Sequence, residues 1–508
     1  MQRRQFLHQS TLAMLALPLR LQGHPLSLHG PGSQMIQALS GLPGAIEDRI
    51  VVIINLAGGN DGLNTVIPIA DYNGYLSLRS NIAVPIASML ALEGENAFGL
   101  HPALTGLQQL YNQGELCIVH SAGYPNPNQS HARSSDIWMT ATAADQYAST
   151  GWAARYLENR FTGFPDGYPN PTMEDPLALQ IGLTPTPTFY GTHQSVAVNL
   201  TNAETFYQLI GENAPPAEEP LPCCQAGEQI AYLRSQQLLA VGYSGQIKNA
   251  ADKGKNLASY PPNNRLADQL KIVARLIHGG LKTKMYFVQL GGFDTHATQV
   301  SLTDNTTGAH ANLLSQLGSA LLSFQTDLKL QGTHQKVLSF TFSEFGRRAN
   351  SNASLGTDHG YAAPMFVVGT SVQKQQLGTI PDLVTDIVWQ SPGVPTSNRF
   401  IGMQMDFRRV YTDILTDWFG NEAGTTQTLL FGSFATTSLL RPTIETIATG
   451  QWGQRSTWSA GRPPLPQERV VVRPGHTLHI PQSVAMRSLD VQGNLQLAPG
   501  VHLSIAEP

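Results

Sequence analysis

The chain of 508 residues has few charged side chains and almost no cysteine. Charged residues make up 13% of it, its formal net charge is −4, and no long run of Lys and Arg occurs. Because it lacks a basic stretch that could follow a nucleic-acid backbone, we expect no nucleic-acid partner. The three cysteines are Cys117, Cys223 and Cys224. Their spacing matches neither a zinc site nor a disulfide framework, so we expect buried or incidental thiols.

The N-terminus also lacks an apolar run long enough to cross a bilayer, which takes about 20 residues. Residues 3–7 (RRQFL) precede a short apolar run at residues 12–19. Paired arginines in this position predict a twin-arginine export signal, with a chance Arg pair as the alternative. We therefore expect a signal and leader over residues 1–40 and no transmembrane span. The twin-arginine export machinery would be a partner, and the protein would be periplasmic or extracellular.

Apolar runs that stop at a glycine turn or a small polar residue recur along the chain. Residues 50–56 (IVVIINL) show this pattern, and it returns at residues 116–120, 285–290, 337–342 and 365–368. Before the fourth of these runs, apolar residues at helical spacing predict a helix over residues 311–328. Strand, helix and strand in this order indicate a parallel sheet. The predicted fold class is therefore α/β with a mostly parallel central sheet.

The other segments predict what surrounds this sheet. Residues 228–239, 263–277 and 407–419 have the pattern of helices that pack on it. Residues 160–225 are rich in Pro, Thr and Asn, which predicts an irregular insertion. From about Arg469 short alternating runs between turns predict a small β module. The predicted parts after the leader are an α/β domain over residues 41–440, a linker over residues 441–468 and the β module over residues 469–508.

Polar residues follow the first two predicted strands, where ligand sites of parallel sheets lie. Asp61 follows the first strand within a glycine turn. Its carboxylate could bind a cation or only form an Asx turn. After the second strand, Ser130 is the first candidate for a nucleophile and Ser135 the alternative, and Arg133 is a candidate for binding an anionic oxygen. A plain helix N-cap at Ser130 is the alternative, and taken by itself the sequence favours it.

A third polar cluster follows the run at residues 285–290. Asp294 and His296 lie two residues apart, so in an extended segment they share a face and could reach one zinc or manganese ion. A loop-capping Asp beside a surface His is the alternative.

A fourth cluster follows the run at residues 337–342 and combines acids, arginines and a histidine. Glu344 and Arg347 come first, and Asp358 and His359 follow. Arg347 is a candidate for clamping an oxyanion bidentately, with a structural Arg–Glu network as the alternative. Four loops with acids or histidines at predicted strand ends together favour a ligand site.

The motifs in chain order resemble a known family. They are RRQFL, GGNDGLN, the Gln-Ser-His segment before residue 136, GGFDTH, SEFGRR and GTDHG. Over roughly residues 48–440 this set resembles the largely uncharacterised exported family labelled domain of unknown function 1501. That family looks like a branch of the alkaline-phosphatase superfamily, which includes sulfatases. The resemblance implies an alkaline-phosphatase-like three-layer sandwich, and typical members use two metals with a Ser, Thr or modified-Cys nucleophile.

Carried over by motif, the resemblance implies Ser130 as nucleophile. The implied metal ligands are Asp61, Asp294, His296, Glu344 and His359. The chain departs from the superfamily pattern in its shorter Asp-to-His spacing, in Phe345 where a ligating His is usual, and in Glu for Asp at position 344. These departures imply a second metal position that is weaker, mononuclear or empty, with His310 and Asp358 as substitute ligands.

The leading hypothesis is an exported metal-dependent hydrolase of phosphate or sulfate monoesters. It attacks with Ser130 and binds the oxyanion with Arg133 or Arg347. The expected cofactor is one or two divalent ions of Zn, Mn or Ca, and the expected substrate is a small-molecule or glycan ester. The alternative is a non-catalytic surface or polysaccharide-associated protein that retains the fold.

Overall fold

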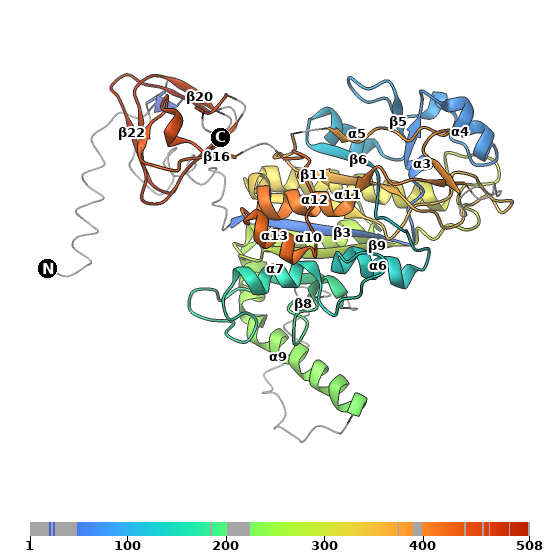
Figure 1. Cartoon of the computed structure of the whole chain (residues 1–508), viewed down its shortest axis with the longest axis horizontal. Helices are drawn as coiled ribbons and strands as arrows, with labels where there is room; N and C mark the ends of the chain where they lie inside the picture. The colour runs from blue at the N-terminus through green and yellow to red at the C-terminus, as the bar shows by residue number, and fades with distance from the viewer. Residues whose placement is uncertain are drawn as a thin grey trace. The chain divides into compact units, whose positions relative to one another are not determined.

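The chain divides into two compact units (Figure 1). A computed structural model describes residues 20–21, 24–25, 48–182, 185–200, 224–373, 375–389, 399–440, 443–459, 462–466, 468–486 and 488–505. The larger unit spans Asp48–Leu440, and the smaller one consists of the described parts of Met1–Glu47 and Arg441–Pro508. Of the predicted leader, the described residues are β1 (Arg20–Leu21) and β2 (His24–Pro25), which pair antiparallel. The rest of the leader lies outside the described residues.

The larger unit is built on a nine-stranded sheet. Its order is β12 (Gln376–Leu377), β6 (Leu116–Gly123), β11 (Ala363–Val368), β10 (Val337–Phe342), β3 (Ile50–Ala57), β9 (Met285–Gly291), β7 (Ala178–Ile181) and β8 (Val198–Leu200), and β15 (Met405–Asp406) also pairs with β6. β11 runs antiparallel to both of its neighbours, and the other pairings are parallel. The predicted mostly parallel sheet is therefore confirmed.

The centre of the sheet fixes where functional loops meet. Ile50–Asn55 of β3 pair with Val337–Phe342 of β10, and Val51–Ala57 pair with Met285–Gly291 of β9. Because these three strands are parallel and in register, their carboxyl ends lie side by side at one edge. The loops after Ala57, Phe342 and Gly291 therefore emerge together.

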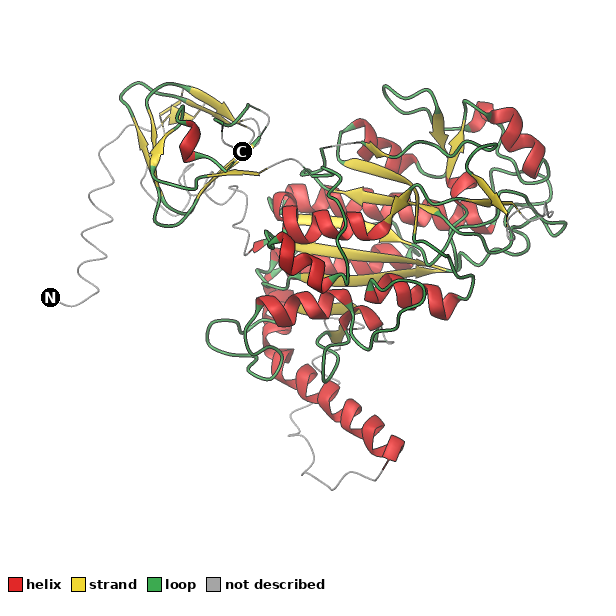
Figure 2. Cartoon of the chain, viewed as in Figure 1, coloured by secondary structure: helices red, strands yellow, loops and turns green. Residues whose placement is uncertain are grey.

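Helices cover both faces of the sheet, which gives three layers (Figure 2). Alternate residues of β3 point to opposite faces. Ile54 and Leu56 pack with α5 (Thr105–Asn112), α9 (Cys224–Lys253), α10 (Arg265–His278) and α11 (Ala309–Leu330). Val51 and Ile53 pack with α6 (His131–Thr140), α7 (Trp152–Arg160), α12 (Phe407–Asp413) and the π-helical η5 (Ile414–Trp418). Coverage of both faces explains why β3 is apolar at successive positions rather than alternate ones.

Smaller elements complete the larger unit. They are α3 (Gly62–Thr65), β4 (Val66–Pro68), α4 (Tyr72–Arg79), η2 (Ile86–Ser88), β5 (Phe98–Leu100), η3 (Pro187–Phe189), η4 (His334–Lys336), β13 (Ile387–Trp389), β14 (Arg399–Ile401) and α13 (Ala423–Leu429). β4 pairs with β5, and β13 pairs with β14, both antiparallel.

The predicted irregular insertion at residues 160–225 is wrong in part. β7 and β8 lie within it and extend the central sheet beyond β9. Each is only three or four residues long and stands among Pro-rich turns, so neither shows a clear strand period. Pairing with β9, a contact distant in sequence, holds them in the sheet.

The smaller unit is a β module of stacked parallel strands. One stack contains β16 (Thr443–Glu445), β18 (Arg469–Val472) and β21 (Ser488–Val491), and a second contains β17 (Gly450–Gln451), β19 (Thr477–Ile480) and β22 (Asn494–Leu497). β20 (Val484–Met486) pairs with β23 (Leu503–Ile505), and η6 (Arg455–Thr457) follows β17. Residues 441–468, expected as a linker, supply β16 and β17, so the module begins earlier than predicted.

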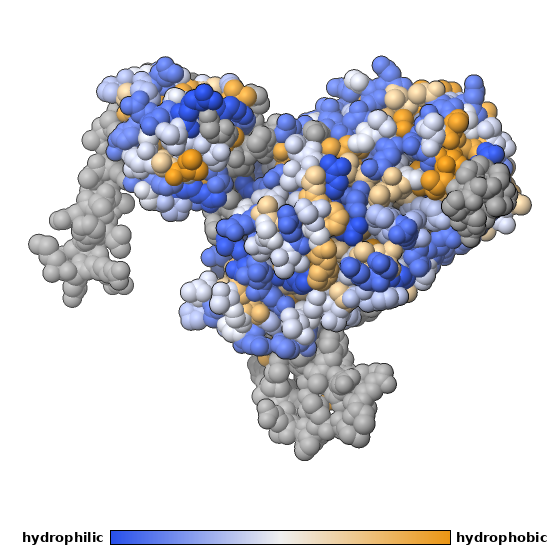
Figure 3. Space-filling view, in the orientation of Figure 1, coloured by the Kyte–Doolittle hydropathy of each residue, from blue (hydrophilic) through white to orange (hydrophobic). Residues whose placement is uncertain are grey.

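The visible surface of the chain is largely hydrophilic. Figure 3 shows a group of hydrophobic residues toward the upper right of the larger unit and hydrophilic residues over most of the rest. Among the described residues, no helix combines the length and the hydrophobicity that a membrane crossing needs.

Candidate metal centre

A group of acids and histidines lies at the sheet edge where the parallel strands end. Asp294 and His296 follow β9, Glu344 follows β10, and His359 precedes β11. His131 is the first residue of α6, which follows β6. The tight approach of these loops depends on Gly58 after β3. Its φ is +123°, and a Cβ there would lie 2.3 Å from the backbone nitrogen of Asp294.

Three imidazole rings present their Nε2 atoms to the carboxylate of Asp294. Its Oδ1 lies 3.1 Å from Nε2 of His296 and 3.2 Å from Nε2 of His359. Its Oδ2 lies 3.5 Å from Nε2 of His131. The Nε2 atoms of His296 and His359 are 2.9 Å apart. One ligand atom each from His131, Asp294 and His359 lies within 4.8 Å of the other two, a spacing that suits a single metal ion.

An oxygen acceptor holds the other ring nitrogen of each histidine. Nδ1 of His131 lies 2.8 Å from Oε1 of Glu344, and Nδ1 of His296 lies 3.1 Å from Oδ1 of Asp358. Nδ1 of His359 lies 2.9 Å from the carbonyl oxygen of Gln129. With a hydrogen on Nδ1 bonded to each of these acceptors, Nε2 is the ring nitrogen that faces Asp294. Such outer partners orient metal-binding histidines in proteins.

The centre of this array brings nitrogen and carboxylate oxygen atoms close together. Nε2 of His296 and Nε2 of His359 lie 2.9 Å apart, and both face Oδ1 of Asp294. A cation at this point would be shared by both nitrogens and the carboxylate. Three imidazoles and one carboxylate fit a borderline ion such as zinc or manganese, whereas calcium prefers oxygen ligands throughout.

The local charges keep the donors in the forms that bind metal. Burial alone would raise the pKa of Asp294, but its hydrogen bond to Arg347, the charge of that guanidinium and the nearby histidines hold it lowered. Burial lowers the pKa of His359, as do the charges of Arg347 and His131, against the hydrogen bonds to Gln129 and Asp294. At neutral pH the carboxylate is therefore ionised and His359 is neutral.

Arg347 supports this cluster from beneath. It is 2% exposed, and it donates to the carbonyl oxygens of Gly59 (2.8 Å), Thr357 (2.8 Å) and Phe293 (3.0 Å). Its Nη2 also donates to Oδ1 of Asp294 at 2.6 Å and to the carbonyl of Gly58. A buried guanidinium with these partners positions Asp294, so the oxyanion role predicted for Arg347 is not supported.

Glu344 contacts the outer ring nitrogen of His131 and does not face Asp294. Its side chain is 4% exposed, and Oε1 accepts from the backbone nitrogen of Gly58 at 2.9 Å besides facing His131. Phe345, which replaces an expected histidine, packs its ring against His131 and His359 at centroid distances of 4.9 and 4.5 Å. These contacts do not support the direct metal role predicted for Glu344, and His131 is the side chain that faces Asp294. Asp358 likewise orients His296 through its Oδ1. Nη1 of Arg348 donates to Oδ2 of Asp358 at 3.0 Å.

Asp61 and His310 belong to a buried network rather than to the cluster. Asp61 is 1% exposed, and its oxygens accept from Nη1 of Arg79 at 2.9 and 2.8 Å and from Nε2 of Gln299 at 2.6 Å. Burial would raise the pKa of Asp61, but Arg79 and these hydrogen bonds hold it lowered. Nε2 of His310 lies 3.0 Å from Oδ1 of Asn60. The metal roles predicted for Asp61 and His310 are therefore not supported by their contacts.

The residues around Ser130 differ in what they reach. Ser130 is exposed at the N-cap of α6, where its hydroxyl makes no capping bond. Arg133 pairs with Asp136, donates to the carbonyls of Ala143 and Ala144 at 3.2 and 3.1 Å, and stacks on Tyr147 at 3.9 Å. These contacts hold the guanidinium of Arg133 against the loop after α6. They do not support its predicted role in binding an oxyanion. The alternative nucleophile, Ser135, lies further along α6.

A family model matches the part of the chain that carries most of this cluster. Residues 246–427 match the model described as "Protein of unknown function (DUF1501)". The resemblance predicted from the motifs is thereby confirmed. The DUF1501 match contains Asp294, His296, Glu344 and His359. No curated protein matches the chain in sequence.

Three solved structures show a distant similarity to the chain. The sulfatase PsFucS1 from Pseudoalteromonas sp. is 12% identical with a TM-score of 0.30, covering 71% of this chain and 70% of its own. Ps i-CgsB in complex with k-i-k-neocarrahexaose is 12% identical with a TM-score of 0.33. The match covers 77% of this chain and 75% of Ps i-CgsB. The lipoteichoic acid synthase LtaP from Listeria monocytogenes is 10% identical with a TM-score of 0.28, covering 68% and 72%.

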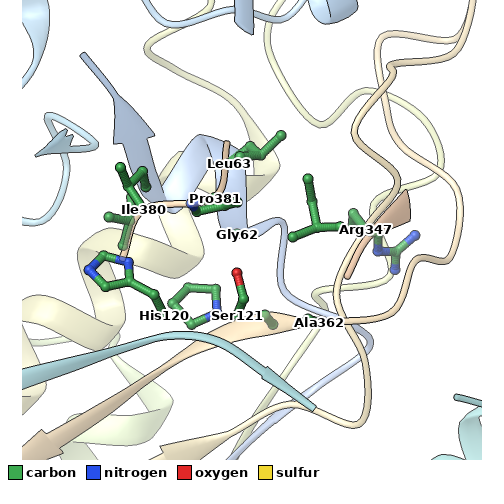
Figure 4. Close-up of a pocket in the computed structure, with 12 residues that line it drawn as sticks. Gly62, Leu63, His120, Ser121, Arg347, Ala362, Ile380 and Pro381 are labelled. Atoms are coloured by element: carbon green, nitrogen blue, oxygen red, sulfur yellow. The ribbon is translucent and has the colours of Figure 1, made fainter. Parts of the chain in front are cut away.

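A small cavity lies against Arg347, which belongs to the DUF1501 match. Figure 4 shows Ser121 and His120 at one side of it, with Leu63 and Pro381 opposite. Its volume is about 20 Å³, which is room for about one water molecule. The cavity is thus too small for an ester substrate.

His131 is the candidate ligand that the sequence prediction missed. It lies outside the DUF1501 match and directly follows Ser130, which drew the attention as a nucleophile. The available signal was the same as for Asp294, a metal-binding side chain just beyond a buried strand. Its pairing with Glu344 spans 213 residues, so only the folded chain reveals it.

Proposed function

We propose that the protein is an exported hydrolase of phosphate or sulfate monoesters that uses one divalent metal ion. His131, Asp294, His296 and His359 would hold the ion. The observation that carries this proposal is the convergence of three Nε2 atoms on Asp294, with every Nδ1 held by an oxygen. Export rests on the paired arginines at residues 3–7.

The charge and exposure of the cluster suit an anionic substrate. One carboxylate with three neutral imidazoles leaves a divalent ion with net positive charge. The side chains of His131, His296 and Asp294 are 41%, 44% and 47% exposed, so an ester reaches them from solvent. When bound, the metal would supply a Lewis acid that polarises an ester oxygen and lowers the pKa of a coordinated hydroxyl or water.

Ser130 is the nucleophile we propose. Its hydroxyl is exposed, free of a capping bond and one residue from His131. It stands at the N-terminus of α6, a helix of ten residues, whose backbone N–H groups and dipole favour negative charge. A phosphate or sulfate group bound there would lie beside both the hydroxyl and the histidine ligand.

The test begins with the full chain, exported natively. We expect about one equivalent of zinc or manganese by elemental analysis, and hydrolysis of 4-nitrophenyl phosphate or 4-nitrophenyl sulfate. His359→Gln should lose the metal and the activity with an unchanged circular dichroism spectrum. His193→Asn, which changes an exposed histidine outside the cluster, is the matched control.

Ser130→Ala separates the nucleophile from the metal centre. We expect it to keep the metal and to lose ester hydrolysis. Metal binding without turnover of either ester by the native protein would favour the alternative, a non-catalytic surface or polysaccharide-associated protein. Absence of bound metal after dialysis against zinc or manganese would contradict the proposal as a whole.

A further inference from the structure

Gln299 joins the two loops that carry most of the proposed metal ligands. Its Oε1 accepts from Oγ1 of Thr295 at 3.0 Å and from Oγ1 of Thr357 at 2.9 Å. Thr295 lies between Asp294 and His296, and Thr357 stands two residues before His359. One amide oxygen therefore ties both ligand loops together.

The same amide is anchored on its other side. Nε2 of Gln299 donates to Oδ2 of Asp61 at 2.6 Å, and Arg79 holds that carboxylate with bonds of 2.8 and 2.9 Å. Gln299 and Thr357 are 0% exposed, and Asp61 is 1% exposed. Rotating the amide by half a turn would face its oxygen toward the carboxylate. The orientation of Gln299 is thus fixed by its partners.

The backbones of the two loops leave little room for adjustment. The backbone nitrogen of Thr357 donates to the carbonyl of Thr295 at 3.1 Å, and that of Gln299 donates to the carbonyl of Leu355 at 2.8 Å. A Cβ at Gly356 would lie 2.4 Å from the carbonyl of His296. A shift of either loop would therefore change the spacing of His296 and His359.

We infer that Gln299 is a positioning residue for the metal centre, with Asp61 and Arg79 as its buried anchor. Through Thr295 and Thr357 it sets the separation of the Asp294–His296 loop from the His359 loop. This inference rests on the proposed function. It also gives a role to Asp61, which the sequence motif suggested as a ligand and which acts two hydrogen bonds away from the ligand loops.

The experiment compares metal binding by the full chain and its variants. Gln299→Leu removes both halves of the amide, and Thr357→Val removes one hydroxyl at nearly constant shape. Loss of an outer partner typically costs about 10–100-fold in metal affinity. We expect a loss in this range for both variants by calorimetry with Zn²⁺, and an altered visible absorption spectrum of the Co²⁺-loaded protein. Thr357→Ser keeps the hydroxyl and should restore affinity and spectrum.

Gln180→Leu provides the matched control. Gln180 is also a buried glutamine of the larger unit, and its Oε1 accepts from the backbone nitrogen of Thr186, away from the ligand loops. It should lower thermal stability without changing the Zn²⁺ affinity or the Co²⁺ spectrum. Wild-type affinity and spectrum in Gln299→Leu and Thr357→Val would overturn the inference alone. Failure of the wild type to bind either ion would overturn the proposed function with it.

Discussion

Two groups of acids and histidines lie at the same edge of the sheet. They differ in the exposure of their carboxylates and in the partners that those carboxylates contact. In the buried group, Asp61 accepts from Arg79 and Gln299 and is 1% exposed. In the exposed group, Asp294 is 47% exposed and faces three imidazole nitrogens. Arg347 donates to Oδ1 of Asp294, and the imidazoles of the cluster face the same carboxylate.

This difference distinguishes a carboxylate with a structural role from one that can bind a ligand. The buried carboxylate of Asp61 accepts from a guanidinium and an amide, so its charge is compensated within the protein. The exposed group instead brings imidazole nitrogens and a carboxylate within reach of one cation. The same residue types therefore predict opposite responses to substitution in the two groups, and the following variants test that contrast.

The largest effect on stability should come from Arg79→Met in the buried group. It leaves the Asp61 carboxylate buried without its cation, which typically costs about 3–5 kcal/mol. Denaturant unfolding of the metal-free chain measures the loss. The double variant Arg79→Met with Asp61→Asn removes the charge as well and should be less destabilised than the single variant. A single variant of wild-type stability would show that the buried pair is dispensable.

The contrasting substitution in the exposed group is Asp294→Asn. Its unfolding free energy should fall by less than that of Arg79→Met, because Asp294 is 47% exposed and Arg347 keeps its carbonyl acceptors. Its Zn²⁺ affinity should fall by more than about 100-fold, since a direct ligand matters more than an outer partner. Asp145→Asn, at an exposed site outside the cluster, should change neither quantity. A large loss of stability with unchanged metal binding would show that Asp294 has a structural role and is not a metal ligand.

These contrasts also show how far the sequence alone reaches. The strands β3, β9 and β10 were predictable because mostly apolar runs of six to eight residues are typical of strands covered on both faces. Their order fixed the loops of Asp294, Glu344 and His359 at one sheet edge. β7 and β8 were not predictable, because they are short and are held in the sheet by pairing with β9.

Within the site, sequence identified the residue types but not their partners. The carboxylate of Asp61 looks the same in a motif whether it meets a metal or the guanidinium of Arg79, which lies 18 residues away. Glu344 and His131 are likewise distinguishable only by which one faces Asp294. The missing information is contact between distant segments, and chain order does not encode it locally.

The buried group should also limit acid stability. Burial lowers the pKa of His310 to about 4; the charge of Asp61 opposes this shift, and those of Arg347 and Arg79 add to it. The unfolded chain binds this proton below about pH 6.5, whereas the folded chain binds it only near pH 4. Stability is therefore lost as the pH falls from about 6.5 to about 4, by on the order of 2 kcal/mol at pH 5.

His310→Gln tests this acid response. Its amide can still donate to Asn60 and does not titrate. With chelator present, the difference in unfolding free energy between pH 7 and pH 5 should shrink relative to wild type. An unchanged pH dependence would mean that His310 is not a source of the acid sensitivity.

The smallest expected effect tests the boundary between ligand and outer partner. Glu344→Gln keeps an oxygen that accepts from Nδ1 of His131 but removes the negative charge that makes the ring a stronger donor to metal. We expect Zn²⁺ affinity to fall by about 10-fold, at the weak end of outer-partner losses, with stability near wild type. Isothermal titration with Zn²⁺ of Glu344→Gln and of Asp294→Asn under the same conditions compares the two losses of affinity. A loss as large as that of Asp294→Asn would make Glu344 a direct ligand, as the sequence resemblance implied, and His131 would then be the residue that supports it.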